Sequence, residues 1–182
     1  MTSAGFPAAA PTLLVGGGLV LRPWFGTDVE AVCEACQDPE IQRWTPAPTP
    51  YTRADAERVV GRSIASWDAG RGGYLALVDP VEDRASGWFG IVDLDADARS
   101  AELGYWLAAP LRGRGIATRA LDTLVEYSFE VGGLDSVYLR IDPANEPSAA
   151  LARRSGFIRT ASRVVGARSP EPLDTYTRLA ED

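Results

Sequence analysis

The stretch AELGYWLAAPLRGRGIATRAL, residues 101–121, joins an alternating apolar segment to a glycine-rich helix start. The alternation at its beginning predicts a strand, and the run after Gly115 has helical periodicity. About four N–H groups at a helix N-terminus lack intrahelical acceptors. Because Gly113 and Gly115 carry no side chains, an anion is able to approach these groups closely. Arg112 and Arg114 add charge-assisted contacts. The stretch therefore predicts a phosphate or pyrophosphate site.

Three other glycine-rich motifs fit this stretch poorly, and a plain turn remains as an alternative. A Walker loop requires a lysine, and the chain has none. A dinucleotide-binding fingerprint requires a glycine where Thr118 stands, and it follows the first strand of a βαβ unit. An RNA-binding arginine–glycine tract is typical of long, disordered segments in basic chains. The remaining alternative is a tight turn that carries surface arginines.

The amino-acid composition excludes several catalytic mechanisms and binding partners. The chain has 182 residues, of which 46% are hydrophobic and 24% charged, and its formal net charge is −7. These values predict a globular domain that does not bind nucleic acid. The absence of His excludes imidazole catalysis, and the absence of Lys excludes Schiff-base chemistry. Cys33 and Cys36 cannot form a four-ligand zinc site alone, so we expect no metal. No segment resembles a signal peptide or a membrane span, so we expect a cytoplasmic protein without membrane contact.

The order of predicted elements indicates one α+β domain over residues 17–182, preceded by a flexible tail at residues 1–16. The pattern predicts about seven strands in a mixed, mostly antiparallel sheet, flanked by about four helices. The expected strands are 18–24, 74–79, 87–94, 101–107, 136–141, 157–165 and 173–179. Helices are expected at 27–38, from 52 to about 68, at 115–131 and at 147–155, the second with a Thr52–Asp55 capping box.

Two motifs resemble those of the GNAT N-acetyltransferases. Arg112-x-x-Gly115-x-Ala117 resembles the family's R/Q-x-x-G-x-G/A signature, in which backbone amides hold the pyrophosphate of acetyl-CoA. NEPSAALARRSGF, residues 145–157, resembles the family's N-x-x-S and (K/R)-x-G-F segment. LRPW, DPEIQRW and LDTYTRL are similar to segments of the RimJ/RimL-type branch. The resemblance runs from residue 18 to residue 180.

This resemblance implies acetyl transfer from acetyl-CoA to a primary amine by direct attack in a ternary complex. It also implies the GNAT fold, in which the fourth and fifth predicted strands, 101–107 and 136–141, separate to admit the pantetheine arm. Backbone groups around Trp106 and Leu107 would pair with pantetheine, while Asn145 and Ser148 would line the other side near the sulfur. The residues implied to hold coenzyme A are Trp106, Leu107, Arg112, Gly113, Arg114, Gly115, Ile116, Ala117, Thr118, Asn145 and Ser148.

An amine must lose its proton before it attacks a thioester. Neutralising an alkyl amine with a pKa of about 10.4 costs roughly 4.6 kcal/mol at pH 7, whereas a protein α-amine costs about 1 kcal/mol. A general base therefore matters more for a side-chain or polyamine-like acceptor. Without His, carboxylates are the candidates. Glu102 is the first choice, because the RimJ/RimL-type branch has Glu at the matching place. An ordinary ion-pairing role for Glu102 is the alternative.

Ser148 is the candidate general acid for the leaving thiolate, with a local hydrogen bond to backbone as its alternative role. Tyr105 is a second candidate for the acid. Glu40, Trp44 and Tyr105 are expected to bind the acceptor, although Trp44 is equally explained as a core aromatic residue. The acceptor is expected to be a protein N-terminus or a small-molecule amine, and a homodimer is left open. The alternative function is a non-catalytic acyl-CoA-binding module with the same fold.

Overall fold

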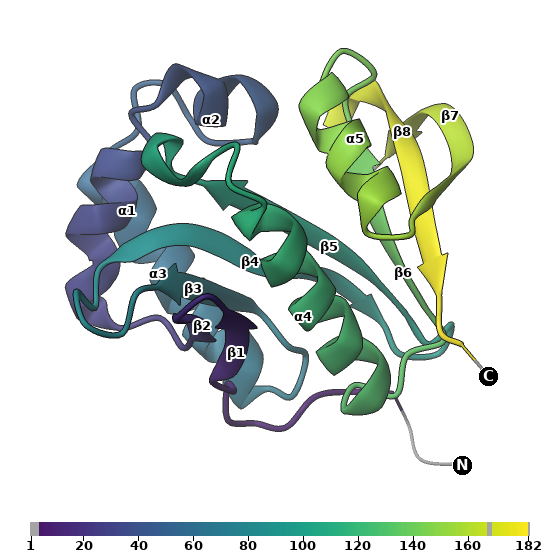
Figure 1. Ribbon diagram of the computed structural model, residues 1–182, viewed down its shortest axis with the longest axis horizontal. Helices are drawn as coiled ribbons and strands as arrows, with labels where there is room; N and C mark the ends of the chain where they lie inside the picture. The colour runs from purple at the N-terminus through teal and green to yellow at the C-terminus, as the bar shows by residue number, and fades with distance from the viewer. Residues whose placement is uncertain (1–3, 167–168, 182) are drawn as a thin grey trace.

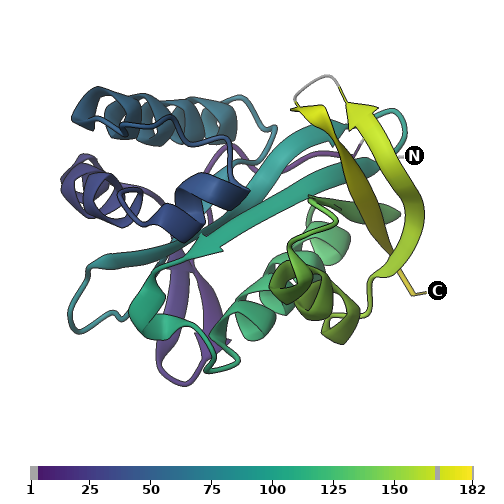
Figure 2. The ribbon, with the colours of Figure 1, turned by 90° about the horizontal axis from the view of Figure 1, so that it is seen from above.

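The structure, a computed structural model, describes residues 4–166 and 169–181. The strands form one sheet with helices on both of its faces (Figures 1 and 2). No helix within the described residues has the length and hydropathy to cross a membrane. The elements follow in the order β1 (Leu13–Gly16), β2 (Leu19–Arg22), η1 (Gly26–Asp28), α1 (Val29–Ala35), α2 (Pro39–Trp44), α3 (Arg53–Asp68), β3 (Tyr74–Val78), β4 (Ala85–Asp95), β5 (Ser100–Leu107), η2 (Ala109–Leu111), α4 (Ile116–Glu130), β6 (Ser136–Ile141), α5 (Glu146–Arg154), β7 (Ile158–Gly166) and β8 (Ser169–Leu179).

The sheet has eight strands in the order β1-β2-β3-β4-β5-β6-β8-β7. β5 and β6 are parallel, whereas the other neighbouring strands are antiparallel. β5 and β6 pair from Ser100–Ser136 to Glu102–Tyr138 and then diverge, as Figure 1 shows. The predicted α+β fold is confirmed, and so is the separation between the strands expected at 101–107 and 136–141.

The segment expected to be a loose tail instead packs on the domain from residue 4 onward. β1 pairs with β2, which raises the strand count to eight. Phe6 is buried, with its ring 5.8 Å from that of Trp67 and 5.8 Å from that of Tyr127. The glycines at 16–18 all have positive φ, so they form a tight turn between LLV and LVL. The sequence predicted a flexible tail that ends at residue 16, whereas these glycines allow the turn of a hairpin.

Five α-helices are found among the described residues, where about four were expected. The additional helix is α2, which begins at Pro39. Proline is favoured at a first helical position because its missing N–H would lack an intrahelical partner there anyway. The Asp38 side chain caps α2 by accepting from the Glu40 N–H at 2.9 Å. The predicted Thr52–Asp55 capping box of α3 is present, with Thr52 N–H donating to Asp55 Oδ2 at 2.9 Å.

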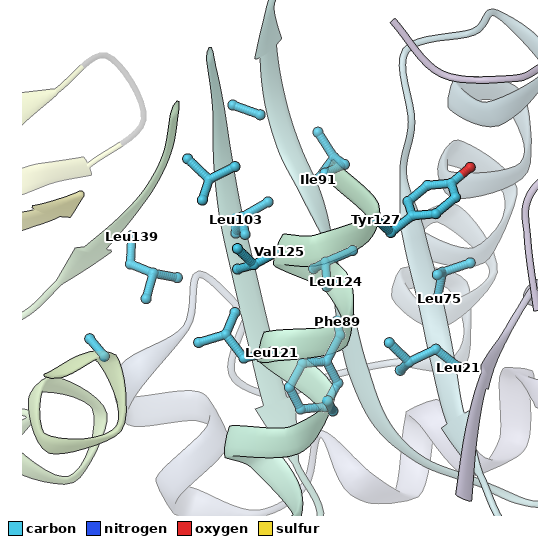
Figure 3. Close-up of a cluster of buried hydrophobic side chains, with 14 of the residues drawn as sticks. Leu21, Leu75, Phe89, Ile91, Leu103, Leu121, Leu124, Val125, Tyr127 and Leu139 are labelled. Atoms are coloured by element: carbon cyan, nitrogen blue, oxygen red, sulfur yellow. The ribbon is translucent and has the colours of Figure 1, made fainter. Parts of the chain in front are cut away.

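The main core lies between α4 and the sheet (Figure 3). α4 contributes Leu121, Leu124 and Val125, all fully buried, and the sheet contributes residues that include Phe89 and Leu103. These α4 positions recur every three or four residues and therefore form one apolar face. α1–α3 cover the opposite face of the sheet, as Figure 2 shows. The packing of α4 fixes its N-terminus close to the end of β5, where the glycine-rich loop lies.

Phe6→Ala tests the docking of the N-terminal segment. The variant removes a buried ring that packs on Trp67 and Tyr127, so the free energy of unfolding should fall by about 3 kcal/mol. Chemical denaturation measures this change. Leu14→Ala in the same segment is the control: Leu14 is 82% exposed, so its loss should change stability by less than about 0.5 kcal/mol. Equal, small effects for both variants would contradict the observed packing.

Candidate active site

The loop between β5 and α4 contains two glycines in the left-handed region. Gly113 has a φ of 73° and Gly115 a φ of 70°, where a residue with a Cβ is strained. A Cβ added at Gly113 would meet nothing within 4 Å beyond its chain neighbours, and one at Gly115 would meet Arg119 Nη1 at 3.5 Å. Both glycines are exposed. The loop therefore presents bare backbone to an approaching group.

The start of α4 has the properties of an anion site. Gly115 is its N-cap residue and supplies no capping side chain, and the first turn contains no acidic residue. The N–H of Arg119 donates to the Gly115 carbonyl at 3.3 Å. The N–H groups of Ile116, Ala117 and Thr118 precede this bond, and N–H groups at this place in a helix have no intrahelical acceptor. Together with the helix dipole they favour negative charge. The predicted loop residues thus fit a pyrophosphate.

The side chain of Arg112 joins this loop to the end of β5 and to α2. Its Nε donates to the Leu107 carbonyl at 2.8 Å, and its Nη2 donates to Asp38 Oδ2 at 2.6 Å. Because Asp38 caps α2, one guanidinium joins the end of β5, the loop and α2. Arg114 is exposed. The sequence predicted that Arg112 and Arg114 both contact a bound anion. In the structure, the guanidinium of Arg112 instead has partners within the protein.

The two faces of β5 carry different candidate residues. Tyr105 and Leu107 belong to the core beneath α4, whereas Trp106 packs with the cluster beneath α1–α3. Alternate strand residues face the same side of a sheet, so Glu102 shares the face of Trp106. Trp88 of β4 lies directly opposite Trp106. Glu102 and Tyr105 therefore lie on opposite sides of the sheet.

Ser148 and Tyr105 meet across the separation between β5 and β6. Ser148 Oγ on α5 lies 2.6 Å from Tyr105 Oη on β5. Asn145 caps α5, and its Oδ1 accepts from the Ser148 N–H at 3.2 Å. The Tyr105 ring stacks on that of Phe89, with centroids 5.6 Å apart. Burial raises the pKa of Tyr105 to about 12, because desolvation disfavours the phenolate. The phenol is therefore protonated at neutral pH.

Glu102 stands where β5 and β6 stop pairing, in register with Tyr138 of β6. Asp93 is its partner on β4, beside an irregularity in the β4–β5 pairing between Ile91 and Asp93. The predicted base is thus placed at the point from which the two strands diverge. No group of three or more His, Cys, Asp or Glu residues that could hold a metal ion occurs within residues 4–166 and 169–181.

Glu40 and Trp44 lie together on α2. Trp44 Nε1 donates to Glu40 Oε2 at 3.0 Å, and the Arg43 guanidinium lies 4.4 Å from the centre of the Trp44 ring. Trp44 is half-buried and Glu40 exposed. Through the ion pair between Asp38 and Arg112, α2 is attached to the glycine-rich loop.

Sequence reasoning missed two residues of this region. Asp38 was not recognised as a partner of the loop, because 74 residues separate it from Arg112. The sequence feature that could have indicated its role as a helix cap is the Asp38-Pro39 pair, which is typical of a helix start. Arg119 has no role among the predictions made from the sequence. Its position four residues after Gly115 places it within one helical turn of the loop, and this spacing was visible in the sequence.

A family profile described as "Acetyltransferase (GNAT) domain" matches residues 18–158. The chain belongs to this family. The protein is thus a GNAT acetyltransferase, as the sequence motifs indicated. It is 26% identical over 140 residues to "Uncharacterized N-acetyltransferase p20" of Bacillus licheniformis, a match that covers 76% of this chain and 78% of that protein.

Two further likenesses concern proteins with named acceptors. The chain is 32% identical over 81 residues to the spermidine N(1)-acetyltransferase of Escherichia coli strain K12, which covers 44% of each protein. Its fold is similar to that of RimL, a ribosomal L7/L12 alpha-N-protein acetyltransferase, in complex with coenzyme A. The TM-score is 0.82 at 19% identity, with 93% of this chain and 98% of that chain covered. At this identity the likeness concerns the fold.

A double-mutant cycle tests the link between the loop and α2. Arg112→Gln removes the charge that faces Asp38, and Asp38→Asn keeps an acceptor for the cap of α2. We expect a coupling energy of about 0.5–1 kcal/mol between the two positions, decreasing in 1 M salt. Chemical denaturation of the four proteins provides the measurement. Strictly additive effects would show that the ion pair does not join the two segments.

Proposed function

We propose that this GNAT acetyltransferase transfers an acetyl group from acetyl-CoA to a primary amine, which attacks directly while both substrates are bound. One juxtaposition carries the proposal: β5 and β6 stop pairing beyond Glu102–Tyr138, and α4 begins after β5 with an exposed, glycine-rich N-terminus. An extended arm that contains amides finds backbone partners along β5. Its pyrophosphate finds the first N–H groups of α4. In acetyl-CoA, an extended arm that contains amides is likewise followed by a pyrophosphate.

The donor is assigned to the residues predicted from the motifs. The loop and the first turn of α4, Gly113 to Thr118, would hold the pyrophosphate. The backbone around Trp106 and Leu107 would pair with pantetheine, which supplies the thioester for transfer. On the other side, Asn145 would keep α5 in place through its cap, so that Ser148 faces the sulfur. Arg112 would act by positioning the loop, since its guanidinium has internal partners.

The acceptor is assigned to the side of the sheet covered by α1–α3, where Glu102 lies. A base there would take a proton from the amine, directly or through water, before attack. A net charge of −7 favours the approach of a cationic amine. A protein N-terminus and a small-molecule amine both fit. Glu40 and Trp44 on α2 would contact the acceptor, because α2 is attached to the donor loop.

We assign departure of the thiolate to the opposite face of the sheet, where Tyr105 lies. As the C–S bond breaks, Ser148 would give its hydroxyl proton to the sulfur and take the Tyr105 hydroxyl proton in return, and the Tyr105 phenolate would then regain a proton from solvent. We assign Tyr105 as the donor in the 2.6 Å hydrogen bond to Ser148 Oγ, so that the Ser148 hydrogen is free to point toward the sulfur. The raised pKa of Tyr105, caused by burial, keeps this donor protonated.

Release of free thiol from acetyl-CoA tests the function. The assay uses a panel of polyamines, aminoglycosides and peptides with free N-termini. Thiol release that depends on an acceptor, together with mass spectrometry of the acetylated product, would support the proposal. Binding of CoA without thiol release from any acceptor would support the non-catalytic alternative. Absence of CoA binding would contradict both.

Glu102→Gln should lower the rate most for amines of high pKa. At pH 7 we expect kcat/KM to fall about 100-fold for an alkyl amine, and much less for a peptide N-terminus, because neutralising its α-amine costs only about 1 kcal/mol. The difference should shrink as the pH rises toward the pKa of the amine. Glu130→Gln, at the exposed C-terminal end of α4, is the matched control. Equal losses for both acceptor types would remove Glu102 as the base.

Tyr105→Phe should lower kcat about tenfold with little change in the KM for acetyl-CoA, because it removes the donor that orients Ser148. Since the pKa of Tyr105 is raised to about 12, its hydrogen is present across the assay range. The ratio of unaltered to variant kcat should therefore be constant from pH 6 to pH 10. Tyr127→Phe, in the core beside Phe6, is the control. A ratio that falls to one by pH 9 would contradict the assigned role.

A further inference from the structure

Arg119 turns back over the N-terminus of α4. It is the fourth residue of the helix, and helix side chains incline toward the N-terminal end. Its Nη1 lies 3.5 Å from the point that a Cβ of Gly115 would occupy, and its Nη2 lies 3.5 Å from the corresponding point at Gly17. The guanidinium therefore lies between the donor loop and the turn that joins β1 to β2.

That turn, Gly16–Gly18, has little around it besides Arg119. Its three residues have φ values of 78°, 66° and 83°, a region that residues with a Cβ rarely adopt. A Cβ added at Gly16 would meet Arg119 Cδ at 4.0 Å, and one at Gly18 would meet nothing within 4 Å. The turn thus leaves the outer side of the guanidinium accessible next to bare backbone.

Arg119 carries its charge at the exposed surface of α4. Within the described part of the chain, no carboxylate lies at ion-pair distance from Arg119. Arg112, by comparison, is held by Asp38. A cation close to the start of a helix is opposed by the helix dipole, so this placement does not stabilise α4. An anion bound at the same place would compensate both the dipole and the arginine.

We propose that Arg119, together with the Gly16–Gly18 turn, binds a phosphate of the donor. The inference rests on the proposed function. Coenzyme A has a pyrophosphate and a 3′-phosphate, and a guanidinium matches phosphate oxygens in geometry and charge. Arg119 would form the wall of the phosphate site on the β1–β2 side of α4. The loop amides form the floor of this site.

The other flank of α4 suits a phosphate less well. A hollow of about 560 Å³ lies there, between α4, the end of α5 and β8. Arg154 and Arg178 line it together with three carboxylates, those of Asp122, Glu126 and Glu181. Arg178 already lies 3.6 Å from Asp122. The acids would oppose a phosphate, so the two flanks differ in the charge that they offer.

Calorimetric titration with CoA and with 3′-dephospho-CoA tests the inference without turnover. Arg119→Gln should weaken CoA binding about tenfold, whereas Arg62→Gln, an equal charge change on exposed α3, should leave it within twofold. A loss seen with CoA and absent with 3′-dephospho-CoA would assign Arg119 to the 3′-phosphate. An equal loss with both ligands would assign it to the pyrophosphate. Both results support a phosphate contact.

Ionic strength gives a second readout. Affinity should fall less steeply with added salt in Arg119→Gln than in the unaltered protein, because one charge contact is missing. Unchanged CoA affinity in Arg119→Gln would overturn the inference, as would a tenfold loss confined to Arg154→Gln on the other flank. If the unaltered protein does not bind CoA, the proposed function itself fails, and that outcome is visible before any variant is examined.

Discussion

β5 and β6 pair over three residues and then part, and the rest of the site depends on this separation. Backbone N–H and C=O groups in the middle of a sheet require partners, and beyond Glu102–Tyr138 these two strands no longer supply them to each other. β4 pairs with β5 along its whole length and holds it in place. The divergence therefore leaves one edge of β5 for an extended ligand. We propose that the donor binds here, where the sheet is incomplete.

The surroundings of this separation are held by a few specific contacts. The buried face of α4 fixes its N-terminus near the end of β5, and Arg112 joins the intervening loop to Leu107 and to Asp38 of α2. Ser148 and Tyr105 connect the two sides through their hydroxyl groups. Because Glu102 and Tyr105 face opposite sides of β5, the proposed removal of the amine proton and the proposed protonation of the thiolate take place on different faces of the sheet.

The sequence predicted the α+β fold, since alternation and helical periodicity are local properties of the chain, and the resemblance to the GNAT family implied the site of divergence. It predicted the open loop because Gly113 and Gly115 carry no side chains, and the structure adds that both have a positive φ. It failed at residues 4–16, which pack on the domain through Phe6 and β1 rather than forming a flexible tail. It also missed the contact of Arg112 with Asp38 and the position of Arg119 beside Gly17. Such contacts join segments far apart in the chain, and no local pattern encodes them.

Backbone amide chemical shifts, followed by NMR as CoA is added, test the central claim most directly. The account predicts that the largest changes occur at the N–H groups of residues 113–118, at the start of α4, and of residues 103–107, along the free edge of β5. These changes should saturate together at one dissociation constant. Changes confined to the hollow between α4 and β8, or a spectrum that CoA leaves unaltered, would contradict a donor held between the diverging strands.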